Sequence, residues 1–299
     1  MGPPTSRSRP PRHTQCSPDQ FHDVFNFCSF QVTKSSAALR YGASYSLAIS
    51  APALSAEARS GASTRNIRCL LRKREELLGV NATRQIACLV PGVYAVGVAD
   101  PARTDADHLR RVEEELKQGT VKALKGYSGC LHYGPDSLGY APYYGLAARY
   151  GVPFIFHTGD TYSSRAKVKF AHPLLVDEAA VDHPDVNFVM AHCGNPWLID
   201  AAEVVYKNAN VWADLSGLLV GDAADFDEMS QRGTLEKVAR NVADAIDYSE
   251  RLDRFLYGSD WPLAPMSSYR SFIEMIVPEE HRAAVFADNA RELFRLPPA

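Results

Sequence analysis

Short apolar runs alternate along this chain with longer stretches of helical period, and this alternation constrains the fold more than any other feature. Strands that alternate with helices in this way are typical of βαβ units in a parallel sheet. The candidate strands number eight: FHDVFNF from Phe21, SYSLAIS from Ser44, VYAVGVAD from Val93, TVKALKGY from Thr120, VPFIFHTGD from Val152, VNFVMAHCG from Val186, NVWADLSG from Asn210 and RFLYGSDW from Arg254. Eight such units favour an α/β fold closed into a (β/α)8 barrel over an open doubly wound sheet.

The stretches between the strands carry the apolar pattern of surface helices. In DADHLRRVEEELKQG, Leu109, Val112 and Leu116 fall on one face, and Gly119 ends the pattern. Similar patterns occur in SLGYAPYYGLAARYG, LLVDEAAVDH, NPWLIDAAEVVYKN and GTLEKVARNVADAIDYSERL. Between Ala51 and Gly92 we expect a loop and one helix around IRCLLRKREELLG. The sequence therefore predicts one TIM-barrel domain over residues 21–299.

The first 20 residues differ in composition from the rest of the chain. The segment MGPPTSRSRPPRHTQCSPDQ is rich in Pro, Ser and Arg and contains no acidic residue before Asp19. Such a segment buries too little apolar surface to order itself, so we predict a disordered tail over residues 1–20. A mitochondrial presequence is the alternative, but the prolines would break its amphipathic helix.

Charge and cysteine content argue against several classes of partner. The 32 Lys and Arg residues against 35 Asp and Glu leave a net charge of -3, and neither GxxxxGK nor GxGxxG occurs. We therefore expect no nucleic-acid partner and no phosphate-binding loop. No apolar run approaches the roughly 20 residues that cross a bilayer, and the first residues lack the apolar stretch of a signal peptide, so we expect no membrane association. The six cysteines include no CxxC pair, which favours reduced thiols and a cytoplasmic location.

Polar residues end three of the candidate strands. His157 ends VPFIF, His192 ends VNFVMA, and Asp260 ends RFLYGS. Taken singly, a histidine there is more often structural and an aspartate often caps a turn. Catalytic residues of a β/α barrel project from the C-terminal ends of the strands, however, so the three together indicate one site. Two imidazoles and one carboxylate suit a divalent metal, Zn²⁺ above all, with an open position for water.

Further polar residues near the strand ends are candidates for binding a small-molecule substrate. Lys125 ends the fourth strand, where it is a solvated lysine, an anchor for a substrate carboxylate, or a carbamylated bridge between two metals. Asp160 and Arg165 lie in the polar loop after His157, which is an ordinary surface loop or a site for an anionic group. His172 contacts the site or caps a helix.

Three more residues follow the last two strands. Asp214 and Ser216 end the seventh strand, where they are candidates to orient Asp260 or His192. Trp261 directly follows Asp260, and we expect it to pack under the loops around the mouth of the barrel.

Several of these segments together resemble a known family. They are HTGD at 157–160, HPLLVDEAAVDHPDVNFVMAHCGNPW from His172, ADLSG at 213–217, YGSDWP at 257–262 and the closing DNARELFRL. This combination is similar to the amidohydrolase-related group of predicted TIM-barrel metal-dependent hydrolases. Within that group it resembles the branch that contains decarboxylases of the aminocarboxymuconate-semialdehyde type.

The resemblance implies roles for the three residues at the strand ends. His157 would be a metal ligand, and Asp260 would be both a ligand and the acceptor of a proton from metal-bound water. His192 would be a second ligand or, in mononuclear members, a general acid and base that stabilises an oxyanion. Homo-oligomer formation is implied by the resemblance alone.

The first candidate strand departs from the family pattern. Members carry Asp-x-His-x-His there, and alternation aims both imidazoles into the barrel. Here the corresponding run starts at Asp23, Phe25 and Phe27 stand where the imidazoles would, and His22 has the opposite parity. The site then binds a metal through the three strand-end residues alone, works without a metal, or is inactive. A fourth alternative is that the first 30 or so residues do not represent the ancestral strand.

Three functions follow from these alternatives. The leading expectation is metal-assisted hydrolysis of an amide, ester or lactone bond in a small carboxylated compound: water on the metal attacks, Asp260 takes its proton, and His192 stabilises the oxyanion. The second is non-oxidative decarboxylation in the same site. The third is a catalytically inactive barrel that binds a metabolite or an assembly partner, as the missing His-x-His suggests.

Overall fold

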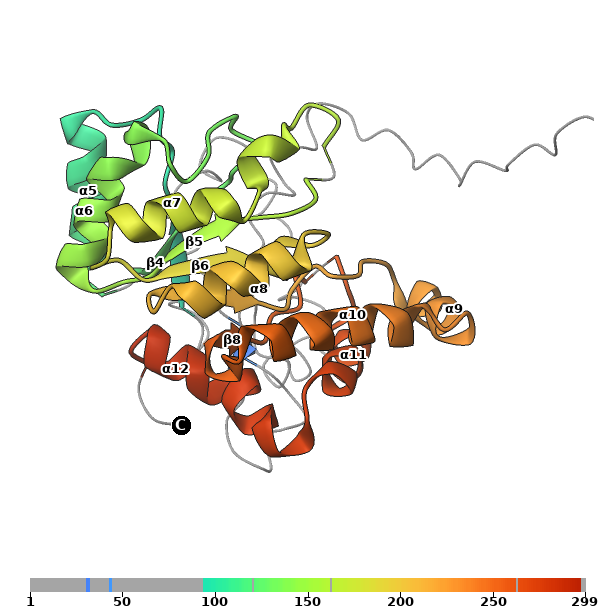
Figure 1. Cartoon of the computed structure of the whole chain (residues 1–299). Helices are drawn as coiled ribbons and strands as arrows, with labels where there is room; N and C mark the ends of the chain where they lie inside the picture. Colours follow the sequence, from blue (N-terminus) through green and yellow to red (C-terminus); the bar gives the residue numbers. More distant parts are fainter. Residues whose placement is uncertain are drawn as a thin grey trace, which may run out of the picture.

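A parallel sheet of short strands forms the centre of the computed structural model of the chain (Figure 1). The structure describes residues 31–32, 43–44, 94–119, 121–161, 163–261 and 263–296. Within them, six strands lie side by side in chain order. These are β3 (Ala95–Val98), β4 (Val121–Gly126), β5 (Phe154–His157), β6 (Phe188–Ala191), β7 (Val211–Asp214) and β8 (Phe255–Leu256). They correspond to the last six predicted strands.

The first two predicted strands fall largely outside the described residues. FHDVFNF, with Phe25 and Phe27, and the predicted tail over residues 1–20 lie outside them entirely. Two dipeptides near the N-terminus are described, β1 (Gln31–Val32) and β2 (Ala43–Ser44), and they pair antiparallel.

Helices connect the strands of the sheet in the order that the sequence predicts. Five predicted segments contain the helices α5 (Ala106–Lys117), α6 (Ala141–Tyr150), α7 (Leu174–Asp182), α8 (Leu198–Lys207) and α10 (Thr234–Ser249). Three further helices, for which no segment was proposed, are α9 (Ala223–Gln231), α11 (Met266–Ile276) and α12 (Asn289–Leu293). Figure 1 shows α9 projecting from the body of the molecule. No helix in the described ranges is both long and apolar enough to cross a membrane.

Local signals explain where individual helices begin and end. The side chain of Asp105 accepts a hydrogen bond from the backbone N–H of His108 at 2.9 Å and so caps α5. Asp222 and Asp225 form a reciprocal capping box at the start of α9. Helix α6 ends at Gly151, whose φ of 61° is the left-handed conformation that favours glycine.

The two faces of the sheet bury different sets of side chains. Toward the helices, Phe154, Phe156 and Phe188 pack in a large cluster that includes buried residues of α5 to α8, α10 and α11. The opposite face, which we call the inner face, carries a smaller cluster to which Ala123 and Ile155 contribute. Successive side chains of a strand point to opposite faces. Residues two positions after Ala123 and Ile155 therefore extend this inner face toward the C-terminal ends of the strands.

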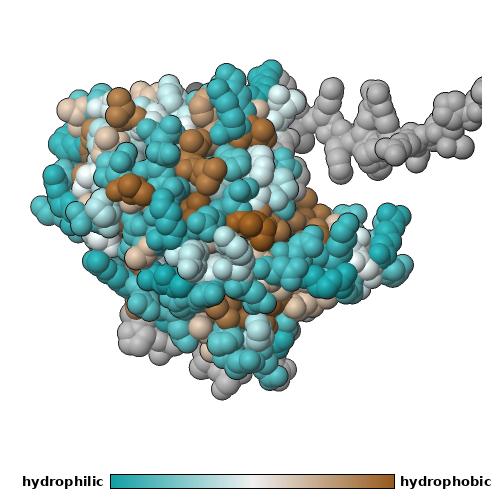
Figure 2. All heavy atoms as spheres, viewed as in Figure 1, coloured by the Kyte–Doolittle hydropathy of each residue, from teal (hydrophilic) through white to brown (hydrophobic). Residues whose placement is uncertain are grey.

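The outer helices present a mainly hydrophilic surface. Figure 2 shows apolar side chains interspersed among hydrophilic ones on this face. Leu174 and Val181 of α7 and Ile199 and Tyr206 of α8 are exposed apolar or aromatic residues. Single exposed side chains of this kind are ordinary in a folded protein.

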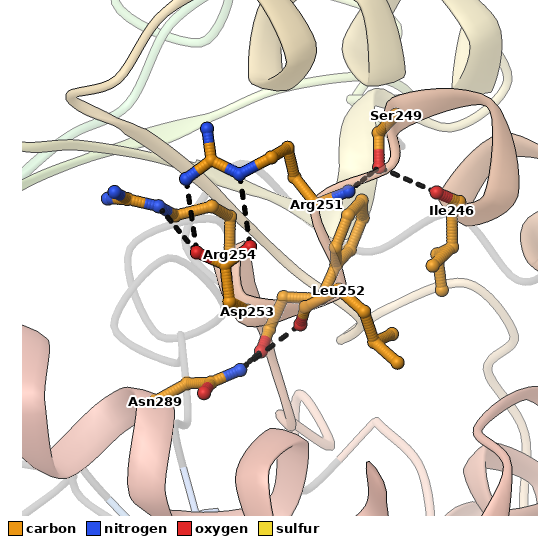
Figure 3. Close-up of polar contacts among 8 residues, drawn as sticks. Ile246, Ser249, Arg251, Leu252, Asp253, Arg254 and Asn289 are labelled. Carbon is orange, nitrogen blue, oxygen red and sulfur yellow. Dashed lines mark hydrogen bonds and ion pairs between the residues drawn. The ribbon is translucent and has the colours of Figure 1, made fainter.

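A charged cluster fixes the N-terminal end of β8 (Figure 3). The carboxylate of Asp253 accepts two hydrogen bonds from Arg251, each at 3.0 Å, and one from Arg254 at 3.1 Å. The guanidinium of Arg254 also lies 4.1 Å from the ring centroid of Trp212 in β7. Asn289 at the start of α12 donates to two backbone carbonyls of the same segment, at 3.2 and 2.9 Å. This end of the sheet is therefore structural.

Candidate active site

Five ionisable side chains gather at the opposite, C-terminal end of the sheet. Lys125 has the parity of Ala123 on β4, and His157 has the parity of Ile155 on β5, so both side chains lie on the inner face. Asp214 is the last residue of β7, His192 directly follows β6, and Asp260 follows β8. Lys125, Asp214 and Asp260 are buried, with 2%, 1% and 7% of their surface exposed. Charged side chains are rarely buried to this extent without a specific purpose.

His192 and Asp260 occupy turns with an unfavourable backbone conformation. Their φ angles are 64° and 53°, and Cys193 has a φ of 47°. Residues other than glycine adopt such φ angles at an energetic cost of about 1–3 kcal/mol each, and they cluster at functional sites. These turns redirect both side chains at the point where their strands end.

Gly217 allows His192 and Asp260 to approach each other. Its φ is 60°, and a Cβ atom added there would lie 2.4 Å from Nδ1 of His192 and 3.2 Å from Oδ2 of Asp260. The side chains of His192 and Asp260 therefore both lie against the Cα of Gly217, and only glycine leaves room for them.

The two histidines lie beside each other. Their ring centroids are 5.0 Å apart in an edge-to-face arrangement. Nε2 of His157 lies 3.0 Å from the backbone oxygen of Asp160. A carbonyl oxygen can only accept, so Nε2 of His157 carries its proton in this arrangement.

The HTGD segment joins the loops after β5 and β6. The hydroxyl of Thr158 donates to the carbonyl of Ala191 at 2.6 Å and accepts from the backbone N–H of Gly194 at 3.2 Å. Gly159 has a φ of 88°, and a Cβ atom there would lie 2.2 Å from the backbone oxygen of Asn195. These contacts fix the distance between the turns that carry His157 and His192.

Asp214 and Ser216 support His192. Oδ1 of Asp214 accepts hydrogen bonds from the backbone N–H groups of His192 at 3.1 Å and of Ser216 at 2.9 Å. Ser216 Oγ also donates to Asp214 Oδ1 and lies 3.0 Å from Nδ1 of His192. The sequence suggests Asp260 or His192 as the residue that Asp214 and Ser216 orient, and these hydrogen bonds connect the pair to His192.

Burial and the Lys125 ammonium set the charge states of the site. Burial lowers the pKa of His192 to about 3, and the positive charge of Lys125 contributes. Burial, the neighbouring His192 and Lys125 hold the pKa of His157 well below its usual range. Burial raises the pKa of Asp260 to about 7, although Lys125 opposes the shift. Near neutral pH both imidazoles are therefore uncharged, and Asp260 can either give or take a proton.

The other predicted substrate-binding residues lie around this cluster in different settings. Asp160 and Arg165 are exposed on the loop after β5, and the backbone oxygen of Arg165 bonds Nε2 of His132 at 2.8 Å. Nδ1 of His172 accepts the backbone N–H of Leu174 at 3.3 Å, so this side chain caps the start of α7. Trp261, next to Asp260, is partly exposed.

The donor atoms match a divalent metal in kind but not in arrangement. Imidazole nitrogens and a carboxylate are ordinary ligands of zinc. In the described part of the chain, however, no three His, Cys, Asp or Glu side chains are placed so that they could hold a metal ion. Nε2 of His157 is directed at a backbone carbonyl instead. The described residues as placed therefore do not fit the predicted three-ligand metal site.

Comparison with protein families gives one match. A family model described as amidohydrolase matches residues 80–296, a range that contains every motif on which the resemblance rests. No curated protein matches the chain at a significant level.

Solved structures share the fold at low sequence identity. An uncharacterized TIM-barrel protein from Bordetella bronchiseptica is 18% identical, with a TM-score of 0.54 over 73% of this chain and 72% of the other. The 5-carboxyvanillate decarboxylase of Sphingomonas paucimobilis is 15% identical, with a TM-score of 0.53 over 76% and 74%. A dihydroxybenzoic acid decarboxylase from Polaromonas, solved with bound manganese and 2-nitroresorcinol, is 16% identical, with a TM-score of 0.52 over 79% and 78%. These similarities confirm the predicted α/β TIM-barrel fold.

Proposed function

We propose, from the premise that this chain belongs to the amidohydrolase family, that it catalyses non-oxidative decarboxylation of a small carboxylated compound. The observation that carries the proposal is the buried ammonium of Lys125, which lies close enough to Asp260 and His192 that its charge opposes the rise in the pKa of Asp260 and contributes to the low pKa of His192. A buried cation beside a protonatable carboxyl group suits the loss of carbon dioxide from an acidic substrate.

Structural neighbours support decarboxylation more than hydrolysis. The proteins from Sphingomonas and Polaromonas are decarboxylases by name, and both names specify carboxylated aromatic compounds. At their identities of 15% and 16% these relatives show the fold alone. For this chain, a carboxylated aromatic compound is the substrate class that we propose to test first.

Each step of the reaction can be assigned to a residue of this chain. The carboxyl of Asp260 gives its proton to the substrate carbon that bears the carboxylate. The bond between that carbon and the carboxylate then breaks, its electron pair stays on the carbon framework, and carbon dioxide leaves. Lys125 stabilises the negative charge that is delocalised onto a neighbouring substrate oxygen. Asp260 regains its proton from solvent, so atoms and charges balance without an oxidant.

A divalent cation, zinc above all, stays a prediction for this chain. Manganese is bound in the Polaromonas enzyme, but the described residues do not present a three-ligand site, so no step here depends on a metal. Stoichiometric metal in protein purified without chelator, and its loss in His157→Ala, is the result that the three-ligand prediction requires.

Hydrolysis is the second candidate, because the family model is described as amidohydrolase. In that reaction His192 or ionised Asp260 would take a proton from the attacking water. Both proposals require a small-molecule substrate. A homo-oligomer stays a prediction, which a measurement of molecular mass in solution would test.

The experiment is a substrate screen that measures two products in parallel. Hydroxybenzoates and related carboxylated compounds, labelled with ¹³C in the carboxylate, are incubated with the full chain, with EDTA or with added Mn²⁺ or Zn²⁺. Decarboxylation releases labelled carbon dioxide, whereas hydrolysis of amide, ester and lactone analogues releases acid without it.

The matched variants are Lys125→Met and Lys122→Met, both on β4. Lys122 lies near the ring of Tyr94, at 5.9 Å, and is not part of the buried cluster. We expect labelled carbon dioxide from the wild type and from Lys122→Met, and roughly a 100-fold or greater loss in Lys125→Met. Release of acid alone would favour hydrolysis, and no turnover of either class would favour the inactive barrel.

A further inference from the structure

The hydrogen bonds around Ser216 have a defined direction. Oδ1 of Asp214 accepts from the backbone N–H groups of both His192 and Ser216, at 3.1 and 2.9 Å. An oxygen that already accepts from two amides is an acceptor for its third partner as well, which is the hydroxyl of Ser216. The Ser216 hydroxyl proton therefore points to Asp214. The lone pairs of Oγ are left for His192.

Both partners of Nδ1 in His192 are consequently acceptors. Nδ1 lies 3.0 Å from Oγ of Ser216 and 3.2 Å from its carbonyl oxygen. A carbonyl never donates, and Oγ has given its proton to Asp214, so Nδ1 must carry the imidazole proton. A neutral imidazole carries a single proton, which leaves Nε2 with a lone pair. In the described part of the chain, Nε2 of His192 makes no hydrogen bond that would compete for it.

We infer that Asp214 and Ser216 are positioning residues that hold His192 in its Nδ1–H tautomer and so make Nε2 the proton-accepting atom of the site. The neighbouring His157 has the opposite arrangement, because its Nε2 donates to the carbonyl of Asp160 at 3.0 Å. Two imidazoles whose rings are 5.0 Å apart thus present different atoms to a ligand. The use of Nε2 as a proton acceptor in catalysis rests on the hydrolysis candidate of the proposed function, but the tautomer does not.

Asp214 also stabilises the backbone of His192. The φ of 64° at this residue is unfavourable, and the N–H at the strained position is bonded to Asp214. The same carboxylate therefore holds both the turn and, through Ser216, the ring. Because Asp214 holds Ser216, and Ser216 contacts the imidazole of His192, the carboxylate also fixes the orientation of the ring.

The tautomer can be measured directly by NMR. The full chain is labelled with ¹⁵N-histidine and treated with EDTA, because a metal on Nε2 would impose the same tautomer. Long-range ¹H–¹⁵N correlation spectra then show which ring nitrogen is protonated, and His192→Gln identifies the signal. Burial lowers the pKa of His192 to about 3, so the ring is neutral throughout the pH range of the measurement. We expect the Nδ1–H form in the wild type.

Variants separate the side chains from the backbone carbonyl. Ser216→Ala and Asp214→Asn should raise the minor Nε2–H form about fivefold, which corresponds to one hydrogen bond of about 1 kcal/mol. Ser216→Thr keeps the hydroxyl and should restore the wild-type ratio. Ser249→Ala is the control, because this buried serine donates to the backbone oxygen of Ile246 and lies before β8, at the opposite end of that strand from Asp260 (Figure 3). Its His192 signal should not change.

The outcomes for this inference and for the proposed function are distinguishable. An Nε2–H wild type would overturn the inference even if a variant failed to fold, and so would unchanged ratios in both Ser216→Ala and Asp214→Asn. With a hydrolysable substrate in hand, Ser216→Ala should lower kcat and leave KM within about twofold, with recovery in Ser216→Thr. If no substrate is turned over, the NMR result still decides the tautomer.

Discussion

Replacement of Gly217 by alanine tests the geometry of the site most sharply. The glycine has a φ of 60°, and the added Cβ would lie 2.4 Å from Nδ1 of His192 and 3.2 Å from Oδ2 of Asp260. A left-handed conformation disfavours alanine by about 1–2 kcal/mol. Overpacking of a fixed neighbour adds about 1–3 kcal/mol. We therefore expect Gly217→Ala to lower the free energy of unfolding by about 2–5 kcal/mol.

The matched control is Gly145→Ala in the exposed middle of α6. A Cβ atom there would meet nothing within 4 Å, and its φ is not positive. Alanine is favoured over glycine in a helix interior by about 1 kcal/mol, so this variant should be as stable as the wild type or more stable. Urea unfolding of the full chain, followed by fluorescence, measures both. Equal stability of Gly217→Ala and Gly145→Ala would contradict the close approach of His192 and Asp260 to Gly217.

Three further predictions follow from the same geometry. Lys125→Met should lose roughly 100-fold or more of the activity, whereas Lys122→Met keeps it; equal loss in steady-state rates would contradict the role of the buried ammonium. Burial raises the pKa of Asp260 to about 7, so the folded state holds this proton more tightly than the unfolded state does. In EDTA, the stability of the wild type relative to Asp260→Asn should therefore fall between about pH 4 and pH 7, and parallel unfolding curves across that range would disprove the shift. Tyr269→Phe removes a buried hydroxyl that donates to the carbonyl of Leu215 at 2.7 Å and should destabilise by about 1–3 kcal/mol in urea unfolding, against less than about 0.5 kcal/mol for the exposed Tyr248→Phe.

Much of the fold follows from periodicity in the sequence. The pattern of Val112 and Leu116 predicts the buried face of α5, and both side chains are buried. The same signal marks α11 after the eighth strand, where Tyr269, Phe272 and Ile276 recur at helical spacing and are buried. Helix α9 has a single buried residue, Phe226, so its sequence offers almost no apolar period.

The candidate site was only partly predictable. A polar residue at the end of an apolar strand is visible in sequence, which is how His157, His192 and Asp260 were selected. The positive φ angles of His192 and Asp260 and the close approach at Gly217 depend on how the strand-end loops meet. No local pattern encodes those contacts, since they join segments far apart in the chain.

The burial of Lys125 could not be predicted from the local sequence either. In sequence, a lysine at a strand end is more often solvated than an anchor for a substrate carboxylate. In the structure the side chain is 2% exposed, because it lies on the inner face of the sheet beyond Ala123. Which face of a strand is enclosed becomes known only when its neighbours are placed.

The reaction proposed for this site is loss of carbon dioxide from a carboxylated substrate, with a proton placed on the carbon that carried the carboxylate. Turnover of a carboxylated aromatic substrate in deuterated water, followed by mass spectrometry of the product, tests it directly. We predict one deuterium in each product molecule, on the carbon that lost the carboxylate, with one carbon dioxide released per deuterium. A product that retains its carboxylate and contains no carbon-bound deuterium would contradict it.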